Sequence, residues 1–173
     1  MDALREYCFQ LREHVANSER NLDSAQISLD AISSYEIIMK TKLLSEENLL
    51  KIMDSAKSRY LGSYYIGTSL VLALLKDFPR IEVAWRELAD SSSAHERWVA
   101  ISIVRDERIH YNFALELVKH AINDKSLKVR LFAIECIYIR DLSSLLPDLK
   151  KRAEVENNMK VLQSIEWVMS RMN

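Results

Sequence analysis

Four histidines are the first candidates for metal binding or acid–base chemistry in this sequence. Glu107 and His110 have the E-x-x-H spacing, which puts both side chains on one helix face and occurs in di-iron helix bundles. Such a site requires a second E-x-x-H and two further inward glutamates, and the sequence contains no second copy of the motif. Glu116 and His120 are four residues apart and are expected to pair on a helix surface. The histidines therefore predict no metal site.

Nucleophilic and phosphate-binding motifs are equally scarce. Cys8 and Cys136 form no C-x-x-C pair and lie among apolar neighbours, which predicts two buried thiols in a reducing compartment. The serine clusters at 33–34, 91–93 and 143–144 fall at expected helix boundaries or polar faces, where capping and solvation explain them. Two isolated glycines cannot build a glycine-rich phosphate loop. These patterns predict a protein that is not an enzyme and uses no cofactor.

The composition indicates which elements must position these side chains. Only two glycines and two prolines occur in 173 residues, far fewer than the turns of a β-rich fold require, so the fold class is expected to be all-α. The net charge of −1 lacks the strongly basic character of most nucleic-acid-binding proteins, and residues 1–50 carry nine acidic against five basic side chains. The apolar run at 69–75 is too short to cross a bilayer, and the N-terminus has no signal-peptide pattern, so we expect a cytoplasmic protein without membrane segments.

Helical periodicity is visible from the first residues. Apolar side chains recur at helical spacing over 2–16. Ser18 or Asn21 is expected to cap the second helix and Ser45 the third, and Gly62 is expected to end the third. The segment 63–76 is apolar almost all round and should be the most buried helix. The polar face of the second helix is expected to be solvated, and it consists of Ser24, Ser28 and Ser34.

Beyond residue 79 the chain repeats itself, and the period of about 33 residues is typical of helical repeat proteins. A shift of 33 residues matches an arginine and three small or apolar positions of one repeat with those of another, namely Arg130, Ala133, Cys136 and Ile137 with Arg97, Ala100, Ile103 and Val104. A weaker third copy follows at a spacing about two residues shorter, and a still weaker one precedes at 69–73. An irregular helical bundle with accidental periodicity is the alternative.

The segment from Asp124 to Ile137 resembles the second helix of a HEAT repeat. That family has an aspartate in the turn, then a Val-Arg pair, here Val129 and Arg130, and then a small residue, here Ala133. We expect Asp124 to cap the helix start. The resemblance to HEAT-like and armadillo-type repeats is best over 106–140, and it implies a right-handed α-solenoid of antiparallel helix pairs. We expect one domain over 1–173, with an N-terminal helical cap at 1–60 and helix pairs over 61–173.

The second helices of such repeats line the concave face, which is the usual binding surface. Helical geometry and the spacing of the repeats predict a ridge with aromatic and charged members on this face. Such residue types dominate binding hot spots. The predicted partner-binding residues are Trp98, Arg105, Leu131, Glu135, Tyr138, Leu162, Glu166 and Met169. Burial of this ridge under an N-terminal helix is the alternative.

The function expected from this surface is non-enzymatic protein binding. Small solenoids of this kind occur among immunity proteins that neutralise a toxin domain, and acidic N-terminal helices would suit a basic toxin or nuclease partner. The alternatives are a nucleic-acid-binding protein resembling the HEAT-like alkylpurine DNA glycosylases, or an oligomeric scaffold or accessory subunit. Nucleic acid is the less expected ligand because the ridge carries few basic residues, Arg105 and Lys128 among them. The sequence does not specify the oligomeric state.

Overall fold

The computed structural model describes residues 3–18 and 21–172, and these segments form an all-helical protein without strands. The all-α prediction is therefore confirmed for the described chain. The contacts between its residues divide the chain into two compact units, 1–82 and 83–173. Each unit is described by itself below.

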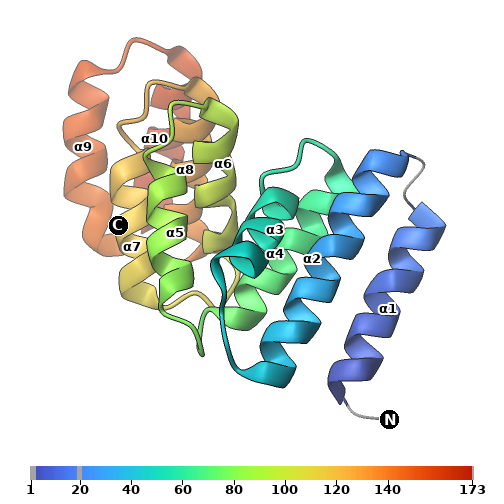
Figure 1. The fold of residues 1–173 in the computed structure, drawn as a ribbon. Coiled ribbons are helices and arrows are strands. Elements are labelled where there is room, and N and C mark those ends of the chain that lie inside the picture. The colour runs from blue at the N-terminus through green and yellow to red at the C-terminus, as the bar shows by residue number, and fades with distance from the viewer. Residues whose placement is uncertain (1–2, 19–20, 173) are drawn as a thin grey trace. The chain divides into compact units, whose positions relative to one another are not determined.

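The first unit is a group of helices in which α2, α3 and α4 pack against one another and α1 packs on α2 (Figure 1). Asn21 caps α2 by accepting hydrogen bonds from the backbone N–H groups of Asp23 and Ser24, and Ser45 caps α3 through the N–H of Asn48, so both predicted caps are confirmed. The helices are α1 (Ala3–Ser18), α2 (Leu22–Thr41), α3 (Glu46–Ala56) and α4 (Leu61–Leu74).

Gly62 does not end the third helix as predicted. Helix α3 already ends at Ala56, and Gly62 is the second residue of α4. The turn before α4 is made by residues 57–60 instead. Glycine at a helix end is a statistical preference, and here it fills the first turn of the next helix.

The serine face of α2 is buried, which corrects the prediction that it is solvated. Ser24, Ser28 and Ser34 are at most 2% exposed. The hydroxyl of Ser24 lies 2.8 Å from that of Ser63 in α4, and Ser28 donates to the same Ser63 oxygen at 3.0 Å. Ser55 of α3 donates to the Ser63 carbonyl at 2.7 Å. Small side chains that satisfy one another's hydrogen bonds let three helices approach closely without leaving a buried polar group unpaired.

Gly67 marks the closest approach in this unit. A Cβ atom at this position would lie 2.0 Å from the backbone nitrogen of Ala56 and 2.5 Å from the Ala56 Cα. The backbones of α3 and α4 therefore touch where the side chain is missing. No rotamer change could relieve such a clash, because the obstructing atoms belong to the main chain.

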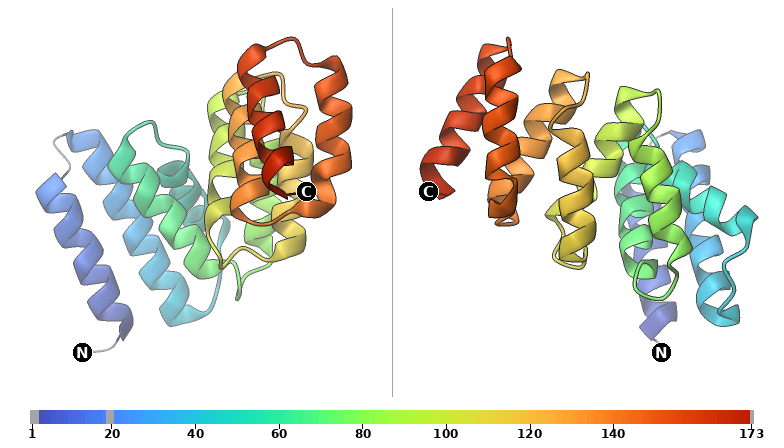
Figure 2. Two further views of the ribbon diagram at one scale, coloured as in Figure 1. Left: turned by 180° about the vertical axis from the view of Figure 1, so that it is seen from behind. Right: turned by 90° about the vertical axis from the view of Figure 1, so that its left-hand side faces the viewer.

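The second unit consists of three helical hairpins that follow one another along the chain, except that the first three residues of the first hairpin, 80–82, belong to the first unit (Figure 2). The second helix of the middle hairpin, α8, packs against α6 on one side and α10 on the other. The buried Trp85 ties the first hairpin together, because its indole N–H donates to the Ala100 carbonyl at 2.8 Å. The hairpins are α5 (Arg80–Ala89) with α6 (Ala94–Ser102), α7 (Tyr111–Ala121) with α8 (Leu127–Ile139), and α9 (Leu146–Val155) with α10 (Met159–Met172).

Two short 3-10 turns connect these hairpins, η1 (Ile103–Arg105) and η2 (Ser143–Leu145). Arg140, at the C-terminal end of α8, donates to the carbonyls of Val104, Asp106 and Ile109 at 2.5–2.9 Å. One guanidinium thus binds three carbonyls of the η1 turn and the following loop, of which that of Asp106 also accepts the Ile109 N–H. Across the described part of the chain, no helix is both long and apolar enough to cross a membrane.

We predict that Gly67→Ala destabilises the protein by about 3 kcal/mol or more, because the added methyl must push two helix backbones apart. Gly62→Ala, in the half-exposed first turn of the same helix, is the matched control and should change stability by less than about 1 kcal/mol. Urea unfolding followed by circular dichroism measures both free energies. Equal stability of the two variants would contradict the close approach of α3 and α4.

Candidate partner-binding site

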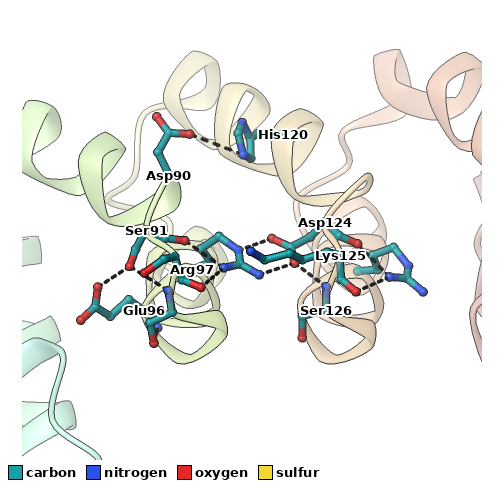
Figure 3. Close-up of polar contacts among 11 residues, drawn as sticks. Asp90, Ser91, Glu96, Arg97, His120, Asp124, Lys125 and Ser126 are labelled. Atoms are coloured by element: carbon teal, nitrogen blue, oxygen red, sulfur yellow. Dashed lines mark hydrogen bonds and ion pairs between the residues drawn. The ribbon is translucent and has the colours of Figure 1, made fainter.

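A buried arginine–aspartate pair connects the first two hairpins of the second unit. Arg97 of α6 donates from Nε and Nη2 to the two carboxylate oxygens of Asp124, at 2.6 and 2.9 Å, and both side chains are at most 6% exposed (Figure 3). Its Nη1 donates to the carbonyls of Ser91 and Ser92 at 2.8 and 2.9 Å. The arginine thereby joins its own hairpin turn to the turn of the next hairpin.

The next hairpin repeats this arrangement. Arg130 of α8 is the repeat equivalent of Arg97, and its Nη1 donates to the carbonyls of Asp124 and Lys125 at 2.7 and 3.2 Å. Its Nε lies 2.9 Å from a carboxylate oxygen of the buried Glu156, in the turn between α9 and α10. Both arginines thus bind two carbonyls in the turn of their own hairpin and a carboxylate in the turn of the next, although only Arg97 uses its Nε in a hydrogen bond. We call this series the arginine ladder.

Asp124 has a different main role from the predicted one. Ser126 is the N-cap residue of α8, and Asp124 accepts the Ser126 N–H at 2.6 Å from two positions earlier in the chain. Burial raises the pKa of the Asp124 carboxyl, but the hydrogen bonds from Arg97 and Ser126 outweigh burial and leave the pKa below its ordinary value. The carboxylate therefore stays ionised as the acceptor at the centre of the ladder.

Glu156 is held ionised even more strongly. Burial raises its pKa, but the backbone N–H of Asn158 and the guanidinium groups of Arg152 and Arg130 together lower the pKa to about 2. Arg152 contributes hydrogen bonds at 2.6 and 3.0 Å. This turn therefore depends on a negative charge that is lost only in strong acid.

The burial pattern corrects the alignment of the third copy by one residue. The buried positions of α8 are Val129, Ala133 and Cys136, and they correspond to the buried Val161, Ile165 and Val168 of α10. The ladder acids, Asp124 and Glu156, have the same spacing as these pairs. The third copy is thus one residue shorter than the repeat before it, whereas the prediction made it two residues shorter. The counterparts of Leu131 and Glu135 are therefore Gln163 and Trp167.

A groove of about 730 Å³ lies on the faces of α6, α8 and α10. Its lining combines aromatic and aliphatic side chains with two lysines and one carboxylate. We call it the second-helix groove, and its main residues are Trp98, Lys128, Leu131, Phe132, Glu135, Lys160, Gln163, Trp167 and Val168. Because all of them belong to one unit, the groove is defined without reference to the first unit.

Aromatic rings stand at two places along this groove. The rings of Trp98 and Phe132 meet edge to face at 5.8 Å, and those of Tyr138 and Trp167 do so at 4.7 Å. Such pairs prefer this geometry because the positive ring edge faces the negative ring centre. The first pair bridges α6 and α8 and the second bridges α8 and α10, so each helix boundary carries an aromatic contact.

Cations cover several of these rings. The Lys128 ammonium lies 3.7 Å from the Trp98 ring centre, the Arg105 guanidinium 4.2 Å from that of Phe132, and the Arg171 guanidinium 5.2 Å from that of Trp167. Arg105 also forms an ion pair with Glu135 across η1 and α8. These contacts hold flexible charged side chains against the groove at defined positions.

The predicted ridge falls partly on this groove. Trp98, Leu131 and Glu135 line it, Arg105 contacts it through Glu135 and Phe132, and Tyr138 contacts it through Trp167. The remaining predicted residues, Leu162, Glu166 and Met169, are not among its lining residues. Each lies one position before the true counterpart of its residue in α8, because the predicted spacing to the third copy was one residue too short.

The predicted ridge lacks three residues that line the groove, Phe132, Lys160 and Trp167. The repeat pairs Phe132 with Val99, which is buried, and this equivalence assigns Phe132 to the core. The spacing of Asp124 and Glu156 was the signal that could have given the correct alignment and hence Trp167.

The histidines and glutamates considered for metal binding or acid–base chemistry make capping contacts and ion pairs instead. His110 accepts the N–H of Asn112 at the start of α7. Glu116 and His120 do not pair with each other as expected, since Arg86 binds Glu116 at 2.7 Å and Asp90 lies 3.6 Å from His120. Within the described residues no group of three or more His, Cys, Asp or Glu side chains could hold a metal ion.

Both cysteines are fully buried free thiols, as predicted. Burial raises the pKa of the Cys136 thiol to about 12, so the thiol is not ionised near neutral pH. Compared with family models, with curated proteins and with solved structures, the chain matches none of them.

We predict that Asp124→Asn lowers the free energy of unfolding by roughly 3–5 kcal/mol, because the change leaves the buried Arg97 charge without its counter-ion. Asp90→Asn removes the exposed partner of His120 and should cost no more than about 0.5 kcal/mol. Chemical denaturation at neutral pH provides both values. A cost for Asp124→Asn as small as that of the control would contradict a stabilising ladder.

The lowered pKa of Glu156 predicts acid sensitivity of the last hairpin. Because its pKa is lower in the folded than in the unfolded chain, the carboxylate stabilises the fold fully above its ordinary pKa of 4.5. This contribution is lost as the pH falls toward about 2. Glu156→Gln should therefore be less stable than wild type at neutral pH, and its stability should fall less steeply as the pH drops from 4.5 toward about 2.

The exposed Glu154→Gln is the matched control, and its pH profile should follow that of wild type. Thermal melts at a series of pH values test both variants. Parallel acid profiles for wild type and Glu156→Gln would show that the Glu156 charge contributes nothing.

Proposed function

We propose that this chain is a non-enzymatic protein-binding module that captures its partner in the second-helix groove. The observation that carries the proposal is the groove itself, about 730 Å³ in volume, with rings and cations from three consecutive second helices along it. Tyr138 and Trp167 remain 41% and 45% exposed although they are large and apolar. Exposed aromatic side chains clustered in a concave surface are typical of binding hot spots.

We also propose that the second unit is built as HEAT-like repeats of a right-handed α-solenoid. The arginine ladder supports this reading, because arginines one repeat apart make the same contacts to successive hairpin turns. Accidental periodicity in an irregular bundle would match residue types without matching their contacts. In a repeat protein, each hairpin adds one helix to a continuous binding face.

The kind of partner proposed is a protein toxin or enzyme domain, neutralised as immunity proteins do. The acidic excess of residues 1–50 would suit a basic toxin or nuclease domain. The basic surface of the partner would bind the acidic helices of the first unit, and a different, non-basic part of it would bind the groove, which carries Lys128 and Lys160. A cytoplasmic location fits this proposal.

Nucleic acid is the competing ligand, by resemblance to the HEAT-like DNA glycosylases. Lys128, Lys160, Arg105 and Arg171 give this surface more positive charge than the sequence alone suggested. Glu135 neutralises Arg105, however, and the whole chain has a net charge of −1. A protein that neutralises many phosphates needs an excess of cations, so we favour the protein partner.

We predict that Trp98→Ala, Tyr138→Ala and Trp167→Ala each weaken partner capture by roughly 2 kcal/mol or more while the fold stays intact. Affinity capture from the source cell, followed by titration of the recovered partner, measures the loss. Tyr111→Ala removes an equally exposed tyrosine from the start of α7, outside the groove, and should leave capture unchanged.

Two results would contradict this function. Early melting of all three variants would identify the rings as core, and salt-dependent binding of duplex DNA or RNA at low ionic strength would favour nucleic acid. Capture of a second copy of the chain alone, seen as a shift in solution mass, would favour the scaffold alternative.

A further inference from the structure

We propose that the second-helix groove recognises an acidic segment of its partner, in which carboxylates alternate with apolar side chains. This inference rests on the proposed protein-binding function and specifies the chemistry of the bound segment. It follows from how charge and apolar surface are distributed along the groove.

The positive charge of the groove is concentrated at the starts of two helices. Lys128 is the second residue of α8 and Lys160 the second residue of α10, so the two occupy equivalent positions of consecutive hairpins. Both are exposed, and the first turns of α8 and α10 contain no acidic residue. Helix N-termini carry a partial positive charge that adds to the lysine charges. This end of the groove therefore attracts anions.

The other charges of the groove are already matched. Glu135 is the one carboxylate among the described lining residues, and it is ion-paired with Arg105. Neither Lys128 nor Lys160 has an ion-pair partner among the salt bridges of the described residues, and Lys128 instead lies over the Trp98 ring. An incoming carboxylate would supply the missing counter-ions, whereas an incoming cation would be repelled at the same place.

Between these charges the groove is apolar. Leu131 and Phe132 of α8 and Trp167 and Val168 of α10 line it beside the two lysines. A purely charged ligand would leave this surface in contact with water, so a leucine-like or aromatic side chain next to the carboxylate is required to cover it. The arrangement fits a peptide with both residue types better than a free anion.

The same contacts disfavour a single-stranded nucleic acid. Unstacked bases bind proteins by lying flat on open aromatic rings. Here a cation covers one face of Trp98, of Phe132 and of Trp167, and each ring also contacts a neighbouring ring. A stacking base would therefore have to compete with a cation on one face of each of these three rings.

The test uses the full chain and a fluorescein-labelled short peptide in which glutamate and leucine alternate. Control peptides carry glutamine or lysine in place of glutamate, and oligothymidylate is the nucleic-acid probe. Fluorescence anisotropy at moderate salt gives the affinities. The key variant is the double charge reversal Lys128→Glu with Lys160→Glu, and the matched control reverses the exposed Lys119 of α7 and Lys150 of α9.

We expect the glutamate peptide to bind wild type and the Lys119/Lys150 control equally, and the Lys128/Lys160 variant at least tenfold more weakly. The glutamine peptide should bind wild type at least tenfold more weakly than the glutamate peptide does. The lysine peptide should bind the charge-reversed variant more tightly than it binds wild type. Circular dichroism melts matching wild type would show that the variant is folded, as expected for two exposed lysines.

Three results would overturn the inference: no binding of the glutamate peptide to wild type, equal binding of the glutamate and glutamine peptides, or tighter binding of oligothymidylate. The proposed function is judged separately, by whether Trp98→Ala, Tyr138→Ala and Trp167→Ala lose the captured partner. Loss of capture without preference for the acidic peptide would leave protein binding standing and reject the acidic segment.

Discussion

The second unit depends on the burial of two arginines whose charges must be matched inside the protein. A buried guanidinium is costly unless its donors are used and its charge is neutralised. Arg97 meets this requirement in full by binding the turn of its own hairpin and a carboxylate in the turn of the next. Arg130 neutralises its charge in the same way, although its buried Nε makes no hydrogen bond. The requirement fixes the offset between neighbouring hairpins, and this offset determines which side chains of α6, α8 and α10 share the groove.

The two units solve the same packing problem with different chemistry. In the first unit, serines with mutually satisfied hydroxyls and the missing side chain of Gly67 bring three helices together. In the second, long side chains bridge the hairpin turns while apolar residues fill the space between helices. The arginine ladder lies at the hairpin turns, and the groove is lined by other side chains of the same second helices.

Composition and periodicity were sufficient for the fold class, the caps Asn21 and Ser45, and most of the helix positions. They were insufficient where the burial or the alignment of a residue depends on its contact with another helix. Ser24 and Ser28 look solvated in sequence, and only the hydroxyl of Ser63 in another helix explains their burial. The predicted spacing of the third copy followed weak apolar matches, whereas the true spacing is fixed by Glu156, which binds an arginine in the preceding hairpin. Phe132 was not predicted to line the groove because its repeat equivalent, Val99, is buried in the core.

The ladder also has a consequence for how the second unit opens. Arg130 holds the turn of its own hairpin and the turn that joins α9 to α10, so detachment of the last hairpin would strand a charge that is now buried. Such couplings between neighbouring hairpins set how far a local opening spreads. Terminal fraying is therefore penalised, and amide protons of α10 should exchange with solvent together with those of α8, as one cooperative block.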